Sequence, residues 1–493
     1  MHFRLEIVAV ADDGTEHQQQ LADVRRTEAT IETLGLTLEE SKRLLHAVQG
    51  AIVAWQVTAY LDDQRACPDC GKRRQLKEHR TAPFRTLFGL VSLPNPRWQQ
   101  CPCQPQTEQT VRPLAALLPE RSSPELRYLE TKWAALASYD SATTMLHDVL
   151  PIDQKHSAVT VRNHLLATAQ RAEQRLGDER AMFVQGSPAE RDQLPIPDGP
   201  LSVGLDGGIV RARRDPTGKQ TSNLFEVIAG KSILAFHRDD PDDVPPSSKC
   251  FALVQSVDTK PKRRLFELLQ SQGMQANQQV TFFSDGGETI RRLPNYLHPE
   301  AEHILDWFHI TMKITVLQQC ARGLSQPKAT PPVPDAADEE SLERRLESAK
   351  HYLWHGNCAM ALDRLQEVED DLELRGCDEN GEKKLPPATD SATRMLKYVR
   401  ELETYLTNNA SSIVNFGERY RHGERISTAF TESTINQVVS KRMVKKQQMQ
   451  WTPEGAHLLL QVRTQVLNDD WQATFRTWYP SFRPVQPSVL STP

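Results

Sequence analysis

The chain has little of several residue types that define common protein classes. Eight cysteines in 493 residues are too sparse for a disulfide scaffold, which excludes the small disulfide-stapled secreted domains. No stretch approaches about 18 uninterrupted apolar residues, so the sequence predicts no transmembrane helix. The first seven residues alternate apolar and charged side chains and lack the basic-then-apolar plan of a signal peptide. We therefore expect no membrane partner, a cytosolic location and reduced thiols.

A large net charge is also missing, because the chain carries only −5 at neutral pH. The charges are unevenly distributed along the chain. Residues 325–392 hold 8 Lys and Arg against 16 Asp and Glu, whereas residues 394–463 hold 11 basic and 6 acidic residues. A basic strip beside an acidic segment is typical of a protein that binds phosphate with selected faces. Solvated helix faces give the same pattern, so charge alone leaves both interpretations open.

The composition does provide material for several folded cores. A hydrophobic content of 38% and a charged content of 25% are those of a globular protein. The length favours about three domains. Four stretches combine Pro, Gly or Ser with acidic residues and are interpreted as linkers. They are 187–200, 238–248, 325–340 and 375–390.

Two closely spaced cysteine pairs lie in the N-terminal part of the chain. Cys67 and Cys70 are separated by two residues, and Cys101 and Cys103 by one. Four thiolates are the number that a structural tetrahedral zinc ion needs. The second pair is tighter than usual, and His79 could replace one of its ligands. We predict a structural Zn²⁺ site, and we interpret the other cysteines as ordinary core or surface residues.

Helical signals surround this cysteine module. Thr37, followed three positions later by Glu40, predicts a capping box at the start of a helix that runs to residue 59. From residue 123 the pattern predicts three short helices, with Pro124 in a first turn and Ser141 and Ser157 as caps. Short helices with tight connections can build a helix-turn-helix module.

The segment 201–323 alternates strand-like and helical patterns. Apolar, β-rich runs lie at 201–206, 209–213, 223–234, 251–257, 280–285 and 302–306, and helical spacing lies at 262–269, 288–293 and 308–320. Early antiparallel strands followed by alternating helix and strand are the order of a ribonuclease-H-like fold. Periodicity alone does not separate that fold from other mixed sheets. We predict an α/β protein with a ribonuclease-H-like core.

Two of the strand-like runs end in the same Asp-Gly-Gly sequence. Asp206 and Asp285 each follow an apolar run and precede two glycines, where the backbone can turn sharply. Carboxylates at neighbouring strand ends suit Mg²⁺, which prefers hard oxygen ligands, and phosphodiester transfer uses two such ions. Asp-Gly is also an ordinary turn signal. Each motif alone fits a turn, but both together in this fold order favour a shared metal site.

A third acid would have to come from the C-terminal third. Glu432 lies in a helical pattern, with Asn436 one turn later on the same side. A solitary Glu on a helix is far more often a solvated residue than a ligand. The apolar side of this helix would consist of Phe430, Thr434, Val438 and Met443. The basic residues that continue the segment and could meet a DNA backbone are Lys441, Arg442, Lys445 and Lys446.

Asp306 competes with Asp285 as the second acid, because it also follows a strand-like run. It begins the sequence Asp-Trp-Phe-His. The histidine of this motif, His309, either contacts a substrate or is an ordinary hydrogen-bonded histidine at a helix start.

With these motifs the chain resembles a bacterial insertion-sequence transposase of the ISKra family. The motifs that carry the resemblance are Val-Gly-Leu-Asp-Gly-Gly at 203–208, Ser-Asp-Gly-Gly-Glu at 284–288, Ile-Leu-Asp-Trp-Phe-His at 304–309 and the run from 431 to 461. The cysteine module also fits. The similarity therefore covers nearly the whole chain and is most specific in the C-terminal third.

The resemblance implies a catalytic triad of the DDE type, which we place on Asp206, Asp285 and Glu432. Asp285 is preferred to Asp306 because it follows the fourth core strand. The triad would hold two Mg²⁺ or Mn²⁺ ions, in addition to the structural Zn²⁺. The expected location is the bacterial cytoplasm, in association with the nucleoid.

The implied partners are DNA, as terminal inverted repeats and target DNA, and further copies of the chain assembled on that DNA. The cysteine module and the helices that follow it would recognise the repeats. Arg162, Asn163 and His164 are candidate base or phosphate contacts, and a structural role explains each of them equally well.

The same interpretation predicts six segments. They are an N-terminal region at 1–118 with its zinc module at 67–103, a helical DNA-binding module at 119–186, the first part of the core at 200–323, an acidic helical insertion at 324–407, the completion of the core with the Glu-bearing helix at 408–480, and a tail at 481–493.

The expected reaction is metal-dependent cleavage at the ends of an insertion sequence, followed by attack of the freed 3′-hydroxyl on target DNA. Two alternatives stay open. One is a ribonuclease-H-like nuclease or resolvase, which would share the metal site without strand transfer. The other is a non-catalytic DNA-binding regulator derived from such an enzyme, and the three intact acids count against it.

Overall fold

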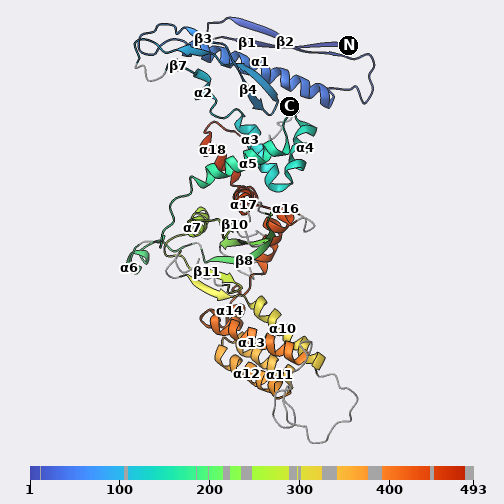
Figure 1. Cartoon of the computed structure of the whole chain (residues 1–493), viewed down its shortest axis with the longest axis vertical. Coiled ribbons are helices and arrows are strands. Elements are labelled where there is room, and N and C mark those ends of the chain that lie inside the picture. Colours follow the sequence, from blue (N-terminus) through green and yellow to red (C-terminus); the bar gives the residue numbers. More distant parts are fainter. Residues whose placement is uncertain are drawn as a thin grey trace. The chain divides into compact units, whose positions relative to one another are not determined.

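The computed structural model of the chain divides into two compact units (Figure 1). The first consists of Met1–Ala172 and Asp469–Pro493, and the second of Glu173–Asn468. The structure describes residues 1–11, 13–104, 109–184, 186–197, 199–214, 223–234, 247–287, 297, 301–324, 341–375, 391–444 and 449–483. The helix expected at 288–293 and nearly all of the linkers expected at 238–248, 325–340 and 375–390 lie outside these residues.

The first unit begins with a two-stranded sheet and one long helix. These elements are β1 (His2–Val10), β2 (Glu16–Arg25) and α1 (Leu38–Gln64). The predicted capping box is confirmed, because the Thr37 side chain accepts from the Glu40 amide and the Glu40 carboxylate accepts from the Thr37 amide. Glu40 also pairs with Arg26 at 2.6 Å, which fixes the end of β2 to the start of α1.

Small sheets carry the cysteine module and pack against α1. Their strands are β3 (Leu76–Glu78), β4 (Thr81–Thr86), β5 (Gly89–Pro94), β6 (Arg97–Gln99) and β7 (Thr110–Val111). The strands β4 and β5 form a hairpin, in which Gly89 has a φ of 116° and permits a tight turn. Val53 and Val57 of α1 pack on Leu93 and Trp98 in one apolar core.

By length and composition, α1 is the one helix among the described residues that could cross a membrane. It is not apolar along its whole length, because Lys42 and Arg43 lie near its start and Asp62 and Asp63 near its end. One side of it is occupied by the protein's own core, through Val53, Val57 and Leu61.

Short helices complete the first unit. They are α2 (Pro113–Leu117), α3 (Pro124–Leu136), α4 (Tyr139–Val149), α5 (Ala158–Glu173) and α18 (Trp471–Trp478). Ser123 and Ser157 cap α3 and α5, as their hydroxyls accept from the amides three positions later. The prediction of Ser141 as a cap was wrong, because Ser138 caps α4 and accepts from the Ser141 amide.

The last helix returns to this unit rather than to the segment with which it was expected to fold. Trp471 Nε1 donates to Thr131 Oγ1 at 3.1 Å, and the Phe475 ring meets the Tyr128 ring edge to face. The residues from Asp469 onward are therefore separate from the predicted core completion at 408–480.

The second unit is built on a mixed sheet, whose described strands are β8 (Leu201–Arg211), β9 (Leu224–Leu234), β10 (Ser248–Val254), β11 (Val280–Ser284) and β12 (Glu302–Leu305). Their order is β10-β9-β8-β11-β12. The pairs β8–β9 and β9–β10 are antiparallel, whereas β11 is parallel to both β8 and β12. The sequence predicted the apolar runs that form these strands, but the runs expected at 201–206 and 209–213 are the single strand β8, and β10 begins and ends three residues before the run expected at 251–257.

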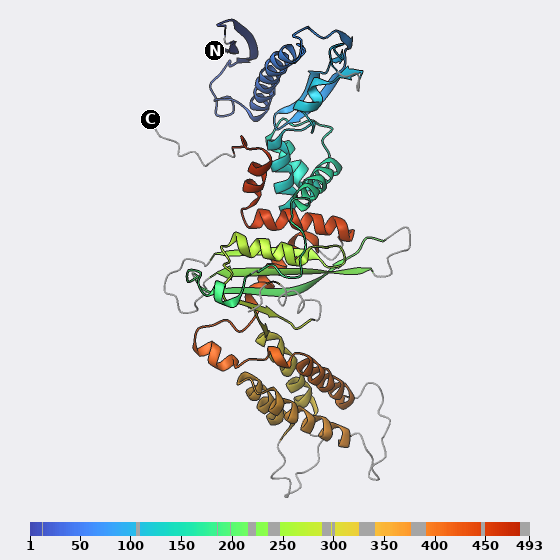
Figure 2. The ribbon, with the colours of Figure 1, turned by 90° about the vertical axis from the view of Figure 1, so that its left-hand side faces the viewer.

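Helices cover both faces of this sheet. Leu201, Val203 and Leu205 of β8 share an apolar core with α7 (Pro261–Ser271), which lies along one face (Figure 2). The opposite face, which carries Gly204 and Asp206, receives α15 (Ala429–Ile435). This alternation of β8 residues between the two faces follows from strand geometry.

The open edge of the sheet is covered by α17 (Pro453–Leu467). Polar side chains on one side of this helix hydrogen bond to the backbone of the edge strand β10. They are His457 with the Val254 amide, Gln461 with the Ala252 carbonyl, and, just beyond the helix, Asn468 with the amide and carbonyl of Cys250. These backbone groups of β10 are thereby satisfied and protected from pairing with another chain.

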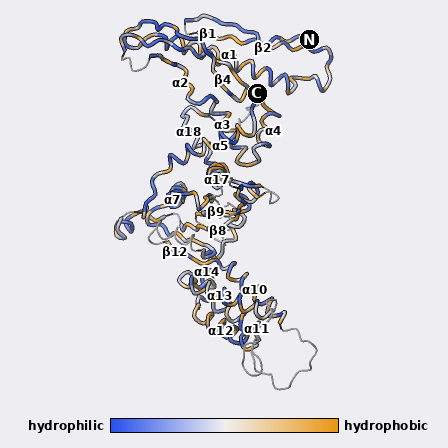
Figure 3. Tube along the Cα trace, in the orientation of Figure 1, coloured by the Kyte–Doolittle hydropathy of each residue, from blue (hydrophilic) through white to orange (hydrophobic). Residues whose placement is uncertain are grey.

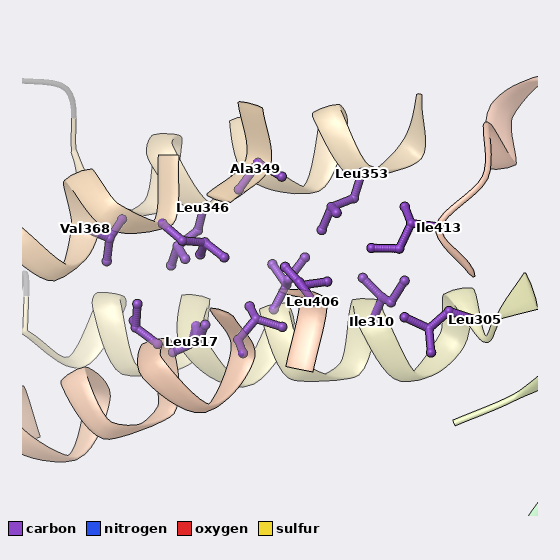
Figure 4. Packing of buried hydrophobic residues seen from close by; sticks show 14 of the residues in the cluster. Leu305, Ile310, Leu317, Leu346, Ala349, Leu353, Val368, Leu406 and Ile413 are labelled. Atoms are coloured by element: carbon purple, nitrogen blue, oxygen red, sulfur yellow. The ribbon is translucent and has the colours of Figure 1, made fainter. Parts of the chain in front are cut away.

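A helical bundle follows the sheet. Its helices are α10 (Trp307–Leu324), α11 (Leu342–Trp354), α12 (Cys358–Arg375) and α13 (Ser391–Asn408). Hydrophobic and hydrophilic residues alternate along each helix (Figure 3). Their apolar sides meet in one core, in which Ile310, Leu317, Leu346, Leu353 and Leu406 point toward one another (Figure 4). The described part of the chain is thus a mixed α/β protein, with helices throughout most of the segment 341–408.

Candidate functional site

Three aspartates lie at equivalent positions of three neighbouring parallel strands, Asp206 within β8 and Asp285 and Asp306 one residue beyond β11 and β12. Phe283 of β11 is paired with Gly204 of β8, and Ser284 is paired with Leu305 of β12. Continuing these registers brings Asp285 beside Asp206 on one side and beside Asp306 on the other. Residues paired in a parallel sheet point to the same face. The register therefore gathers three carboxylates on one face of the sheet, near the carboxyl ends of β11 and β12.

Asp206 lies within β8 and does not end it. The strand continues through Gly207 and Gly208 to Arg211, so the turn expected after Asp206 is wrong. The Asp206 carboxylate is half-buried and accepts from the Gly207 amide at 2.7 Å. The two glycines are therefore strand residues, and a Cβ atom on Gly208 would make ordinary contacts with Ile435 and Val439 at 3.7 and 3.8 Å.

Asp285 does sit at a turn. It follows the last residue of β11, and the next residue, Gly286, has a φ of 82°, which favours glycine. Its carboxylate accepts from the Gly287 amide at 3.0 Å and is half-buried. This carboxylate therefore has one oxygen fixed by the turn and lies at the same strand edge as Asp206.

Asp306 has a different environment, although its place in the register is equivalent. Its side chain is fully buried. One oxygen accepts from the amides of Phe308 and Thr428, at 2.9 and 3.1 Å. The other accepts from His309 Nδ1 at 2.6 Å and from the Thr428 hydroxyl. Asp306 therefore joins β12, α10 and the segment before α15.

His309 lies in the electric field of all three aspartates. The hydrogen bond from its ring to Asp306 raises the pKa of His309, burial opposes the rise, and the charges of Asp306, Asp285 and Asp206 add to it. The His309 side chain is 33% exposed. Nδ1 is held by Asp306, and among the described residues no hydrogen bond is made by the outer nitrogen Nε2.

Two polar side chains of the bundle end lie at this edge and were missed by sequence reasoning. Burial and the charges of Asp285 and Asp306 raise the pKa of Tyr405. The Tyr405 hydroxyl and Asn409 Oδ1 are buried without a hydrogen-bond partner in the described structure. A Cβ on Gly286 would lie 2.6 Å from Asn409 Oδ1, so this oxygen adjoins the turn after Asp285. Nothing in an amphipathic helix pattern marks such residues.

The helix α15 crosses directly over β8 beside Asp206. A Cβ on Gly204 would lie 1.9 Å from Thr431 Oγ1 and 2.7 Å from the Phe430 ring. Thr431 thus sits over Gly204, on the same face as Asp206. The backbone of Glu432 belongs to α15, next to Thr431. The side chain of Glu432 lies outside the described part of the structure.

The helix changes its pitch immediately after α15. Residues Asn436–Ser440 form a π-helical turn, and Arg463 of α17 donates to the carbonyls of Gln437 and Val438 there. A π-turn adds one residue to a helical turn, so the residues that follow it face a different side of the helix than α-helical spacing predicts. Thr434, Val438 and Met443 are buried as expected, but Thr431 and Val439 join them, and Asn436 is exposed.

The predicted basic strip divides into exposed and buried residues. Lys441 is exposed, whereas Arg442 is only 3% exposed and lies over the Trp451 ring. Arg442 therefore packs inside the unit, which corrects the expectation that it meets a DNA backbone. Lys445 and Lys446 lie outside the described residues.

The four predicted cysteine ligands converge in the first unit. The Sγ atoms of Cys67 and Cys103, and those of Cys70 and Cys101, are each 3.5 Å apart, and all four lie within 4.8 Å of one another. A tetrahedral zinc ion with Zn–S bonds of about 2.3 Å separates its sulfurs by roughly 3.8 Å. The cluster could therefore hold a structural metal such as zinc. His79 is not part of it.

The turn at the first cysteine pair favours a thiolate. Burial raises the pKa of Cys67, but hydrogen bonds from the amides of Asp69 and Cys70 outweigh it and lower the pKa to about 7. Within the described residues, this is the one group of three or more Cys, His, Asp or Glu whose ligand atoms converge so closely.

The candidate DNA-contacting residues of α5 have different surroundings. Arg162 and Asn163 are exposed. His164 instead shares a hydrogen bond of 2.6 Å with the buried Glu130, and His156 lies 2.9 Å from the other oxygen of Glu130. His164 thus has the structural role.

A polar cavity of about 230 Å³ adjoins the sheet face that carries Asp206, nearer the start of the strands. Its walls come from β8, β11 and the loop after α14 (Phe416–Arg421). Arg425 lines it, lies 4.5 Å from the Phe430 ring centre, and has its pKa lowered to about 10 by burial.

No protein-family model and no curated protein matches the chain. The fold and the cysteine cluster define a mixed α/β protein that could hold a structural metal such as zinc.

Proposed function

We propose that the chain is a metal-dependent DNA transposase of the DDE type, similar to the insertion-sequence transposases of the ISKra family, with a ribonuclease-H-like core. The observation that carries the proposal is that Asp206, Asp285 and α15 lie on the same face of the sheet, where β8 and β11 are neighbours. Asp206 is on the central strand, Asp285 is its neighbour in register, and α15, which bears Glu432, lies on the same face.

The strand order supports the core. In a ribonuclease-H-like sheet, three antiparallel strands are followed by two parallel ones, with the first strand in the centre. The order β10-β9-β8-β11-β12 has this arrangement. The helices α11–α13 stand between β12 and α15 in the sequence, as expected of an insertion between the last core strand and the helix with the third acid.

The bonding of the aspartates supports Asp285 rather than Asp306 as the second metal ligand. Both oxygens of Asp306 already accept two hydrogen bonds each from protein groups. A carboxylate has about four lone-pair sites, so this set saturates it. The hydrogen bond to Asp285 from Gly287 occupies one of its oxygens.

The donor set at this edge fits a hydrated divalent ion. Asp206, Asp285 and Glu432 would hold Mg²⁺ or Mn²⁺. The buried Tyr405 hydroxyl and Asn409 Oδ1 have no hydrogen-bond partner among the described residues, and water bound to such an ion could hydrogen bond to both. When bound, two ions activate a nucleophilic oxygen and stabilise the leaving oxygen of a phosphodiester.

The chain's own residues would then support two in-line displacements. In the first, water attacks the phosphorus at the element's end, and the bond to the 3′-oxygen breaks and leaves a 3′-hydroxyl. In the second, that hydroxyl attacks a phosphodiester of target DNA, and the target's own 3′-oxygen leaves with the proton. His309, held by Asp306, would position a phosphate oxygen through Nε2.

The first unit would contact DNA. A zinc ion on the four cysteines would order the loops at residues 67–103, and Arg162 and Asn163 on α5 are exposed and able to reach phosphates or bases. Lys441 in the second unit, with Lys445 and Lys446 in sequence after it, would add phosphate contacts.

The test uses full-length protein, a plasmid carrying the element with its native flanks, and Mg²⁺. Asp206→Asn, Asp285→Asn and Glu432→Gln should each abolish cleavage and joining, while end binding in a gel-shift assay stays within about twofold. Asp178→Asn is the matched control, because Asp178 is 97% exposed and the substitution removes the same charge. Full cleavage by Asp206→Asn would refute the proposal.

The same assay separates the two rival functions. A ribonuclease-H-like nuclease or resolvase would cleave but produce no joined target product. A non-catalytic regulator would bind the ends and cleave nothing with any divalent ion. Either outcome in the wild-type protein would overturn the transposase assignment.

A further inference from the structure

The helix α1 has an apolar side that stays exposed next to those that the unit itself covers, since α1 contacts both the cysteine module and β2 and Ala51 is buried as well. Val53, Val57 and Leu61 are buried against the cysteine module. Leu45 and Ile52 belong to the exposed side, at 37% and 39% exposure. At about 100° per residue, the centres of the two sets lie roughly 130° apart around the helix.

The exposed apolar residues recur at intervals of seven. Leu38, Leu45, Ile52 and Ala59 form one row, and Leu38 is 58% exposed. Half-buried apolar residues lie three positions after Leu45 and Ile52; they are Val48 and Trp55. Apolar residues at a spacing of seven, with others three positions later, are the pattern with which two helices pack knobs into holes. We call this row and its neighbours the α1 seam.

Charges are confined to the ends of the α1 seam. Between positions 44 and 61, His46 is the one residue that can carry a charge near neutral pH. Lys42 flanks the seam at its start and Asp63 flanks it at its end. The Lys42 ammonium donates one proton to the His147 carbonyl and carries two further N–H groups. A parallel pair of α1 helices would place like charges together, whereas an antiparallel pair would place Lys42 of each helix beside Asp63 of the other.

We propose that α1 pairs antiparallel with α1 of a second copy of this chain, about a two-fold axis at Ile52. Leu45 then packs against Ala59 of the partner subunit, and Ile52 packs against the partner's Ile52. A two-fold arrangement needs one surface that is complementary to itself. The α1 seam meets this requirement in both its apolar row and its end charges.

A membrane is the other environment that an exposed apolar helix suggests. The side of α1 that carries Val53 and Val57 is already packed on protein, and the apolar stretch ends in charged residues at both ends. A seam of this kind is also narrower than the all-round apolar surface of a spanning helix. These features favour a second helix as the occupant.

The first experiment is sedimentation velocity of the full-length, zinc-loaded protein without DNA over a dilution series. The wild type should sediment as a dimer. Leu45→Glu with Ile52→Glu places unpaired charges in the seam and should weaken dimerisation by more than about 100-fold. Val159→Glu is the matched control, because Val159 is 65% exposed on helix α5, outside the seam, and its replacement should leave the dimer intact.

The second experiment fixes the direction of the pair. Ile52→Cys should form a disulfide-linked dimer under mild oxidation, because the two Ile52 positions meet at the axis. Leu45→Cys should not, because the two Leu45 positions would be about 21 Å apart at roughly 1.5 Å per residue. Asp63→Lys should weaken the dimer, and Lys42→Glu combined with Asp63→Lys should restore it.

A wild-type monomer at every concentration would overturn the proposal, and so would a dimer that survives Leu45→Glu with Ile52→Glu. Cross-linking through Leu45→Cys would overturn the antiparallel arrangement. If the wild type floats with neutral lipid vesicles and the variant with Leu45→Glu and Ile52→Glu does not, the α1 seam binds a membrane instead of a second helix. Circular dichroism of each variant confirms that it is folded.

Discussion

At the scale of single residues, the neighbouring carboxylates of Asp285 and Asp306 differ in how their oxygens are bonded. Asp306 is fully buried, and protein groups from α10 and from Thr428 donate to both of its oxygens. Asp285 is half-buried and accepts one described hydrogen bond, from the Gly287 amide. Asp306 therefore serves the structure of the second unit, whereas Asp285 can serve a ligand.

Asp306→Asn should destabilise the second unit. The substitution weakens the hydrogen bonds to His309 and Thr428 in a buried site, and hydrogen bonds to charged groups contribute about 1.5–3 kcal/mol each. Asp285→Asn, at a half-buried carboxylate, should change the free energy of unfolding far less. Urea unfolding of both variants measures the difference, and equal stability of the two would contradict the structural role of Asp306.

Glu173 should contribute stability that is lost in acid. Burial raises its pKa, but hydrogen bonds from His457 and Arg264 and their charges outweigh burial and lower it from 4.5 to about 2. A folded-state pKa below the unfolded value gives stability that is complete above about pH 4.5 and lost as the pH falls toward 2. Glu173→Gln should flatten this part of the stability–pH curve in urea unfolding. An unchanged slope would show that the network adds nothing.

The sequence indicated both aspartates as strand-end acids but could not distinguish their environments. The Thr428 amide and hydroxyl reach Asp306 from a residue more than a hundred positions away. Such a contact exists only after the chain has folded, so no local pattern could have indicated it. Tyr405 and Asn409 were missed for the same reason.

At the scale of elements, α15 can approach β8 as closely as it does only because residue 204 has no side chain. The Thr431 hydroxyl occupies the space where a Cβ on residue 204 would lie. The helix can therefore pass directly over the strand beside Asp206 because that position is glycine.

Gly204→Ala should push α15 away from the sheet. Overpacking of this kind typically costs about 1–3 kcal/mol, and cleavage should fall more than stability does because the helix carries Glu432. Gly323→Ala is the control, since a Cβ there would meet nothing within 4 Å and alanine favours a helix. Thermal unfolding and the plasmid cleavage assay together test this. Full activity in Gly204→Ala would separate α15 from the site.

The strands of the sheet were predictable because they are continuous apolar runs. The glycines after Asp206 were misjudged as turn residues, since the strand continues through them in pairing with β9, which a local Asp-Gly-Gly pattern does not indicate. The π-turn at Asn436–Ser440, whose carbonyls accept from the distant Arg463, was not predicted either. Nor was the β4–β5 hairpin, which turns at Gly89.

At the scale of the whole molecule, the chain divides differently from the linear order of its predicted segments. Spacing predicted the cysteine module, and the family resemblance implied the helical stretch in the middle of the chain. The sequence did not predict that α18 returns to α3, because the contact of Trp471 with Thr131 joins residues more than three hundred positions apart. Long-range pairing of this kind leaves no periodic trace in either segment.

Removal of zinc should affect the first unit alone. The protein should carry about one zinc per chain, and a strong chelator should lower the unfolding temperature of the unit that contains the cluster while the second transition stays unchanged. Metal analysis and calorimetry measure both. Cys70→Ser should reproduce the effect, and Cys320→Ser, outside the cluster, should not. Full thermal stability after complete chelation would remove the structural role.

The most direct test of the proposed catalytic site replaces Mg²⁺ with Fe²⁺ and adds ascorbate and peroxide, so that radicals formed at the ion cut the nearby backbone. We expect cuts near Asp206, Asp285 and Glu432 in the wild type, all lost together in Asp206→Asn, and none near the cysteine cluster, because the zinc proposed there does not generate radicals. Cuts near the two aspartates without any near Glu432 would contradict the proposal, because the third acid would then lie away from the metal.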